Sequence, residues 1–296
     1  ELGQDEVVTI TPTSVEITDL EGLTIKPKEY EISWDAIAAQ KGGFTHFMLK
    51  EIFEQPKAVA DTLIGRLSDN RQIVLDELRM SPDEIRALKK ITVIACGTAY
   101  HAGMVAKYAI EKWAKIPVEV EIASEYRYRD PIIDSGTLVI AISQSGETMD
   151  TLMAVRHAKA AGARVLAICN TNSSTIPRES DAVLYTHAGP EIAVASTKAL
   201  LTQMIAVYLI GLHLAQVNGA LNDDQVAELY NELLELPGKI EQILETVEPL
   251  LKPGETGQQF VRHFSGRAVG CGTAGGKFFF HQRRQILFHQ RRQILF

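Results

Sequence analysis

Hydroxyl side chains and a glycine are concentrated in the hexapeptide Ser-Gln-Ser-Gly-Glu-Thr at residues 143–148. The hexapeptide follows an apolar, strand-like run at 137–142 and leads into a helix-like run at 148–161. Where a strand passes into a helix, the first N–H groups of the helix lack partners, and the helix dipole is positive. The position of this hexapeptide therefore predicts a site for an anion.

The side chains of the hexapeptide can hold such an anion directly. Ser143, Ser145 and Thr148 can each donate a hydrogen bond, and Gly146 lets the backbone approach closely. The loop contains no lysine, which excludes a Walker-type nucleotide loop. We therefore expect a site for the phosphate of a small molecule. The alternative is an ordinary helix cap rich in Ser and Thr.

The composition excludes several classes of protein. The 296 residues are 46% apolar, which is enough for about two domains with a sizeable core. The net charge of -7 argues against a nucleic-acid partner. Neither a signal peptide nor a run of 18 apolar residues is apparent, so we expect no membrane association.

The cysteines indicate a reducing environment. Cys96, Cys169 and Cys271 are far apart and form neither a disulfide framework nor a paired zinc motif. The sequence therefore predicts a cytoplasmic protein without a metal site, and no motif in it calls for a cofactor.

Apolar runs alternate with helix-like segments through the middle of the chain. This alternation predicts an α/β fold built on a doubly wound parallel sheet of about five strands. The expected strands are residues 91–95, 118–122, 137–142, 164–169 and 182–185. The expected helices are residues 98–114, a short one capped by Ser124, 148–161 and 196–217. Ligands of such sheets bind at the carboxyl ends of the strands, where residues 97–98 and 143–148 would lie.

The flanking regions have other patterns. Residues 1–32 alternate as short strands do, and residues 47–78 have a helical pattern that Pro56 should break or kink. Ser81 and Glu84 have the spacing of a capping box. Residues 223–251 predict one amphipathic packing helix.

The C-terminal region has two unusual features. The glycine-containing run at 267–277 loosely repeats the pattern of 93–99, which would suit the start of a second copy of the fold. The octapeptide at 281–288 recurs unchanged at 289–296. We interpret this repeat as an artefact of cloning or sequencing, with a basic binding patch as the alternative.

Four segments occur together in the order and spacing of a known family. They are Phe47-Met-Leu-Lys-Glu-Ile-Phe-Glu-Gln-Pro56, Cys96-Gly-Thr-Ala-Tyr-His101, the hexapeptide at 143–148 and Val194-Ala-Ser-Thr-Lys198. With them the chain resembles the glutamine–fructose-6-phosphate aminotransferase family, the glucosamine-6-phosphate synthases, from its first residue to about residue 260.

The resemblance implies a division into domains. Residues 1–45 would be the β-rich end of a glutaminase domain, and residues 46–90 a helical linker with entry helices. Residues 91–220 would form the first sugar isomerase (SIS) domain, which is flavodoxin-like, and residues 221–260 a connecting helix. Residues 261–296 would be a partial or corrupted start of a second SIS domain with a duplicated tail.

The resemblance also implies a ligand and its contacts. In the family, the loop corresponding to 143–148 holds the phosphate of fructose 6-phosphate, and the segments corresponding to Thr98 and 194–196 contact the sugar. The implied substrate-binding residues are Thr98, Ser143, Gln144, Ser145, Thr148, Val194 and Ser196. The expected ligands are fructose 6-phosphate and glucosamine 6-phosphate, and the expected assembly is a homodimer.

The chain departs from the family where the chemistry takes place. It begins with Glu1 rather than the nucleophilic cysteine, and Ala99 and Ala193 replace a usual serine and glycine. The family's isomerase acids and bases and its imine-forming lysine have no counterpart after residue 260. We interpret Lys198 as a solvated or phosphate-facing lysine rather than as that imine lysine. We therefore expect no catalytic residue and no activity from this chain alone.

Other functions remain open at this point. A non-catalytic SIS-domain sensor of sugar phosphates would use the same cavity without chemistry. A ketose/aldose phosphate isomerase would need an acid–base pair near the 143–148 loop, and the sequence offers no convincing one. A dinucleotide-dependent dehydrogenase is disfavoured because residues 97–103 do not match the glycine fingerprint.

Overall fold

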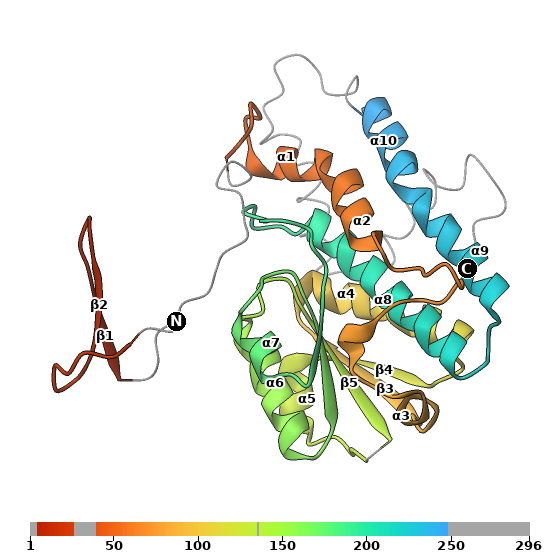
Figure 1. Cartoon of the computed structure of the whole chain (residues 1–296), viewed down its shortest axis with the longest axis horizontal. Helices are drawn as coiled ribbons and strands as arrows, with labels where there is room; N and C mark the ends of the chain where they lie inside the picture. The colour runs from red at the N-terminus through yellow and green to blue at the C-terminus, as the bar shows by residue number, and fades with distance from the viewer. Residues whose placement is uncertain (1–4, 27–39, 135, 248–296) are drawn as a thin grey trace.

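A five-stranded parallel sheet lies at the centre of the computed structural model, which describes residues 5–26, 40–134 and 136–247 (Figure 1). Its strands are β3 (Lys90–Ala95), β4 (Val118–Ile122), β5 (Thr137–Ser143), β6 (Arg164–Cys169) and β7 (Ala182–Tyr185). They lie in the order β4-β3-β5-β6-β7. The predicted α/β fold is therefore confirmed, and each expected strand agrees with the structure to within one residue.

The strand order creates a switch point between β3 and β5. The chain leaves β3 in one direction to build β4 and then returns to build β5 on the other side of β3. In this flavodoxin-like order, ligands bind in the crevice outside the carboxyl ends of the two switch-point strands. Ala95 pairs with Ile142 in the register of β3 and β5, so the loops at 96–98 and 143–148 begin side by side.

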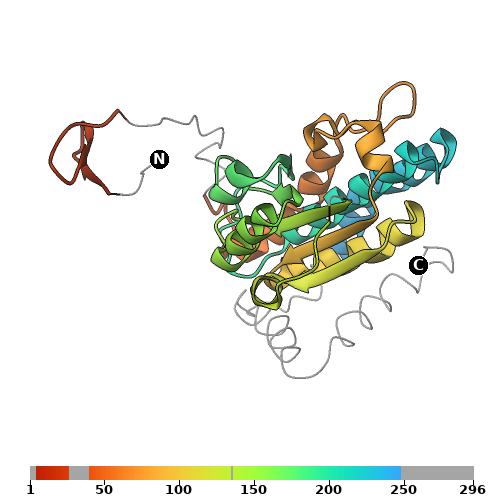
Figure 2. The same cartoon turned by 90° about the horizontal axis from the view of Figure 1, so that it is seen from below.

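Helices cover both faces of the sheet, as Figures 1 and 2 show. One face packs against α4 (Gly97–Trp113) and α8 (Lys198–Val217), and the other against α5 (Ala123–Arg129), α6 (Met149–Ala160) and α7 (Thr175–Glu179). Side chains of β5 alternate between the two cores, with Ile140 and Ile142 on the first face and Val139 and Ala141 on the second. The apolar strand runs follow from this burial on both faces.

The apolar helix α8 is a core helix. Within the described residues it alone is long and apolar enough to cross a membrane, but 61% of its apolar window is buried inside the protein. It packs closely against α4. A Cβ added at Gly211 of α8 would lie only 3.2 Å from the ring of Trp113 on α4. Its hydrophobicity is therefore explained by its position between α4 and α2 (Gln55–Leu63).

The helical prediction for residues 47–78 was only partly correct. The break near Pro56 is confirmed, because α1 (Phe47–Phe53) ends before α2 begins. However, α2 stops at Leu63, and Gly65 adopts a left-handed φ of +72°. The following residues form a turn closed by a bridge between Leu67 and Ile73, and then a short 3-10 helix, η1 (Asp76–Leu78). Apolar side chains of this irregular segment, such as Ile73 and Leu75, are buried in the core. Their spacing in the sequence resembles that of a helix, which explains the incorrect prediction.

Other helix boundaries also differ from the expectations. The capping box of Ser81 and Glu84 is confirmed at the start of α3 (Pro82–Arg86). Ser124 lies inside α5 and does not cap it. The helix expected at 223–251 is two helices, α9 (Asp223–Leu234) and α10 (Leu236–Val247), because Pro237 lacks the N–H that would continue the α9 ladder.

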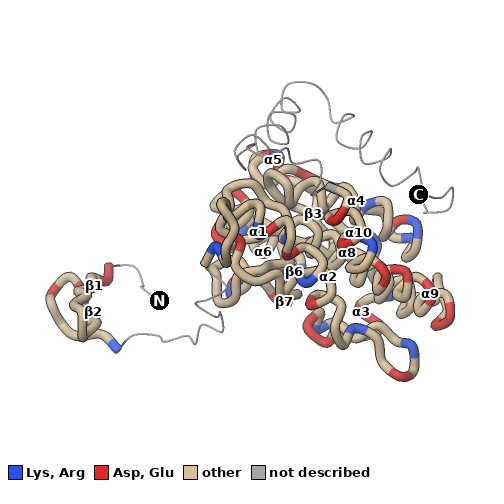
Figure 3. Tube along the Cα trace, turned by 90° about the horizontal axis from the view of Figure 1, so that it is seen from above, with Lys and Arg blue, Asp and Glu red and all other residues tan. Residues whose placement is uncertain are grey.

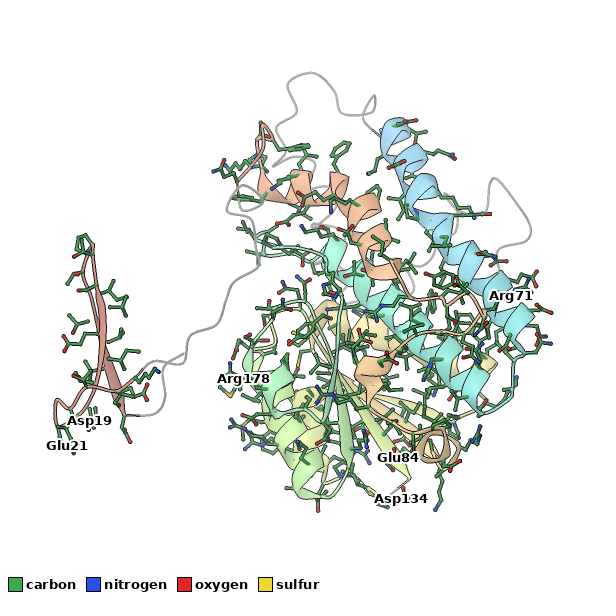
Figure 4. The ribbon with its side chains drawn as sticks, viewed as in Figure 1. Asp19, Glu21, Arg71, Glu84, Asp134 and Arg178 are labelled. Carbon is green, nitrogen blue, oxygen red and sulfur yellow. The ribbon has the colours of Figure 1, made fainter. Side chains whose placement is uncertain are left out.

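At the N-terminus, β1 (Glu6–Ile10) and β2 (Val15–Asp19) form an antiparallel hairpin. The carboxylate of Asp19, labelled in Figure 4, accepts hydrogen bonds from the N–H groups of Glu21 and Leu23 and closes the turn that follows. Later in the segment 1–32, whose alternation predicted short strands, residues 23–25 form no strand and contribute only a bridge between Thr18 and Thr24. The expected repeat of the fold at 267–277 and the duplicated octapeptide lie outside the described residues.

A half-buried histidine on α8 should make the stability depend on pH. Nδ1 of His213 on α8 donates to the carbonyl of Ile73 at 3.1 Å, which ties the irregular segment to the core. Burial lowers the pKa of His213, and the bond to Ile73 and the charge of Asp76 oppose this shift only in part. The unfolded chain therefore takes up this proton at a higher pH than the folded chain does.

The neutral His213 contributes its stability in full above about pH 6.5, and this contribution is lost as the pH falls through the lowered folded pKa. We expect the melting temperature to fall more steeply between pH 7 and pH 5 in the parent than in His213→Gln. The control is His101→Gln on the exposed side of α4. Parallel pH profiles for the parent and His213→Gln would contradict this expectation.

Candidate functional site

A cavity of about 430 Å³ lies at the carboxyl ends of β3 and β5, at the switch point of the sheet. Its size falls within the range of small-molecule sites. It is lined by residues 96–99, 142–145 and 193–196, together with Thr148, Thr151, Glu191 and Gln203.

The predicted site residues come together in this cavity. All of them line it, although they come from three separate segments of the chain: Thr98, Ser143, Gln144, Ser145, Thr148, Val194 and Ser196. Their role in binding stays a prediction. Sequence reasoning missed Cys96, Thr151, Glu191 and Gln203, which also line the cavity. Cys96 could have been included because it adjoins Thr98 at the end of a predicted strand.

The serines of the 143–148 loop accept hydrogen bonds from the backbone of the loop. Ser143 Oγ accepts a hydrogen bond from the N–H of Gly146 at 3.0 Å, and Ser145 Oγ accepts one from the N–H of Glu147 at 3.2 Å. A hydroxyl that accepts still has its own hydrogen to donate. The loop thus stabilises itself through the lone pairs of its serines and leaves O–H donors for a ligand.

Thr148 does not behave as an ordinary helix cap. It is the N-cap residue of α6, but its side chain makes no capping hydrogen bond. Its hydroxyl lies 3.3 Å from Ser143 Oγ instead, in the wall of the cavity. The alternative of a simple Ser/Thr cap therefore does not account for Thr148.

Gly146 is required by the packing of the loop. It has a left-handed φ of +67°, and a Cβ there would lie 1.9 Å from Ser174 Oγ and 2.8 Å from Cys169 Sγ. The carbonyl of Gly146 also accepts from the N–H of Ile176 at 2.9 Å. The close approach that this glycine permits is thus to the 169–176 region, and the sequence had suggested an approach to the anion itself.

Glu147 is directed away from the cavity. Its carboxylate accepts from both the N–H and the hydroxyl of Thr175, at 2.7 and 3.0 Å, at the first turn of α7. Its negative charge is therefore engaged with the neighbouring helix and does not line the predicted anion site.

On the 191–196 side, Glu191 organises the cavity wall. Its carboxylate accepts from the N–H groups of Thr197 and Ala199 at 2.8 and 3.1 Å and thereby caps α8. The hydroxyl of Ser196 also donates to Glu191, at 3.0 Å, so toward a ligand its oxygen is free to accept. Val194 is fully exposed and also lines the cavity.

Residues of α1 and the turn that follows it hold this loop in place. Glu51 Oε1 accepts from the N–H groups of Ile192 and Ala193 at 2.6 and 3.1 Å. Burial raises the pKa of Glu51, and these two hydrogen bonds act in the opposite direction. Lys198 is buried and pairs with Glu54 at 2.7 Å, so its interpretation as a solvated or phosphate-facing lysine was wrong.

An anion in this cavity would have to be held by neutral groups. Among its lining residues that the structure describes, Glu191 carries the only charged side chain, and none is Lys or Arg. Along the described trace, Lys and Arg are interspersed with Asp and Glu (Figure 3). Hydroxyl donors and the N-termini of α4 and α6 are then the groups that can stabilise an anion. No cluster of three or more metal-ligating side chains occurs within the described residues.

Comparison with protein families gives a match to the SIS domain model over residues 84–212. Over 250 residues the chain is 59% identical to the glutamine–fructose-6-phosphate aminotransferase (isomerizing) of Streptomyces coelicolor. The match covers 84% of this chain and 41% of that protein. The enzyme of the same name from Mycolicibacterium smegmatis is also 59% identical, over 82% of this chain and 40% of its own length.

Solved structures show the same relationship. The C-terminal domain of glucosamine-fructose-6-phosphate aminotransferase from Francisella tularensis is 46% identical, with a TM-score of 0.63, and the match covers 67% of this chain and 55% of that one. A putative phosphosugar isomerase from Clostridium difficile, 21% identical with a TM-score of 0.61, shares the fold. Residues 84–212 thus match the SIS domain, and the chain is similar to the glutamine–fructose-6-phosphate aminotransferases, of which it spans about 41% of the length.

Proposed function

We propose that this chain is the sugar-phosphate-binding part of a glutamine–fructose-6-phosphate aminotransferase, and that its cavity binds fructose 6-phosphate and glucosamine 6-phosphate. The observation that carries the proposal is the group of hydroxyls from Ser143, Ser145 and Thr148 in the cavity wall at the start of α6. None of these hydroxyls has its hydrogen committed to a helix cap.

The two ends of such a ligand would use different groups. A phosphate dianion only accepts hydrogen bonds, so it suits the donors of the 143–148 loop and the N-terminus of α6. Sugar hydroxyls both donate and accept, so they suit Thr98, the backbone of Val194 and the accepting oxygen of Ser196. Gln144, which directly follows β5, would then also contact the ligand.

The proposal extends to the organisation of the whole protein. The domain boundaries expected from the family, with the first SIS domain at 91–220, remain proposals, as does the homodimer. The relatives' name indicates that a complete protein would transfer nitrogen from glutamine to fructose 6-phosphate. The expected inactivity of this chain alone stays a prediction.

The proposal is tested by calorimetric titration with fructose 6-phosphate. Ser145→Ala and Thr148→Ala should each weaken binding by about tenfold, because each loses one hydrogen bond to a charged group, worth roughly 1.4 kcal/mol or more. The control is Ser180→Ala, whose hydroxyl donates to the carbonyl of Ile176 outside the cavity. If both cavity variants bind as tightly as the parent, the phosphate is held elsewhere.

A further inference from the structure

One polar side chain in the cavity wall is left unexplained by the fold. Gln203 lies in the second turn of α8, is 2% exposed and lines the cavity. Its Oε1 is buried without any hydrogen-bond partner among the described residues. The adjacent Thr202 is equally buried, but its hydroxyl donates to the carbonyl of Ala199 inside the helix.

A buried amide oxygen without a partner is unusual, because such groups are nearly always hydrogen-bonded. A leucine or methionine would fill the same volume in this apolar helix without leaving a polar atom desolvated. Since the amide lines the cavity, a molecule in the cavity can supply the missing partner. Rotation of the terminal amide by half a turn exchanges its oxygen and nitrogen, so it offers either an acceptor or donors to that molecule.

The chemistry of the amide distinguishes between the two ends of a sugar phosphate. A buried carbonyl oxygen needs a donor, and a phosphate dianion has none to give. The phosphate already has the hydroxyls of Ser143, Ser145 and Thr148 as possible donors. A sugar hydroxyl can donate to the amide oxygen and can also accept from the amide nitrogen. Gln203 therefore matches the polyol part of the ligand.

We propose that Gln203 is a specificity-determining residue that hydrogen-bonds a hydroxyl of the bound sugar, an inference that rests on the proposed binding of sugar phosphates. It distinguishes a phosphorylated sugar from a phosphate ester that lacks hydroxyls. The hydroxyls of the 143–148 loop cannot make this distinction by themselves, because both ligands carry a phosphate.

The test compares two ligands, fructose 6-phosphate and ethyl phosphate, by calorimetry or competition. In Gln203→Met, binding of fructose 6-phosphate should weaken by about tenfold or more. Binding of ethyl phosphate should stay within about twofold of the parent, because it has no hydroxyl for the amide to contact. Thr202→Val is the matched control, since it removes a buried polar group one residue away outside the cavity wall, and it should change neither affinity.

The other possible results each contradict either this inference or the proposed function. If Gln203→Met binds fructose 6-phosphate as the parent does, the inference is wrong and the proposed function stands. Equal losses for both ligands would assign Gln203 to the phosphate or to packing and overturn the inference. A parent that binds neither ligand would overturn the proposed function and, with it, this inference.

A second variant covers the case in which Gln203→Met fails to fold. Gln203→Asn keeps the amide and withdraws it by one methylene, so the cavity wall stays polar. The same selective loss for fructose 6-phosphate is expected, and unchanged affinities for both ligands would overturn the inference.

Discussion

Fructose 6-phosphate is expected to bind this chain at least about a hundredfold more tightly than fructose. A hydrogen bond to a charged group contributes roughly 1.5–3 kcal/mol, and about 1.4 kcal/mol corresponds to a factor of ten in affinity. Two such bonds from the hydroxyls of Ser143, Ser145 and Thr148 therefore suffice for this difference. Calorimetric titration of the parent with both sugars measures it directly.

A salt series provides the control for this titration. Because no Lys or Arg lines the cavity within the described residues, general attraction between opposite charges should contribute little. Raising sodium chloride from about 0.1 M to 1 M shortens the screening length from about 10 Å to 3 Å and should leave most of the preference intact. Equal affinity for fructose and fructose 6-phosphate at low salt would contradict the phosphate site.

Gly146→Ala is expected to destabilise the protein by about 2–5 kcal/mol. A left-handed conformation costs a residue with a Cβ roughly 1–2 kcal/mol, and overpacking a buried contact adds about 1–3 kcal/mol. Both penalties apply at Gly146, where φ is +67° and the new Cβ would lie 1.9 Å from Ser174 Oγ. Urea denaturation gives the change in the free energy of unfolding.

Gly162→Ala separates the two penalties. Gly162 also has a left-handed φ, of +87°, but no atom lies within 4 Å of a Cβ built there. Its substitution should cost only the conformational part, roughly 1–2 kcal/mol. Similar losses for the two variants would show that the contact with Ser174 is not tight, and the account of the loop would then be wrong.

The fold could be predicted largely because most of its strands and helices are indicated by the residues within them. Strands such as β5 and β6 are short, nearly continuous apolar runs, and such runs predict burial on both faces of a parallel sheet. The hydroxyls of 143–148 could be identified in the same way, since one loop carries them all. The site then followed from the rule that ligands bind at the carboxyl ends of strands.

What could not be predicted depends on contacts between distant segments. Lys198 looked like a ligand or surface lysine because nothing in its neighbourhood shows that Glu54, 144 positions away, pairs with it. Gln203 belongs to no recognisable motif, and the packing of α8 against the sheet brings it to the cavity. The end of α2 at Leu63 was missed because buried apolar residues beyond it imitate a helix.

Binding of a phosphate by the 143–148 loop can be observed in a crystal structure of the chain with fructose 6-phosphate bound. We predict that the phosphate oxygens lie within hydrogen-bonding distance, about 2.5–3.2 Å, of at least two of the hydroxyls of Ser143, Ser145 and Thr148. A phosphate bound outside the cavity, or a sugar bound in it with its phosphate away from these hydroxyls, would contradict this binding mode.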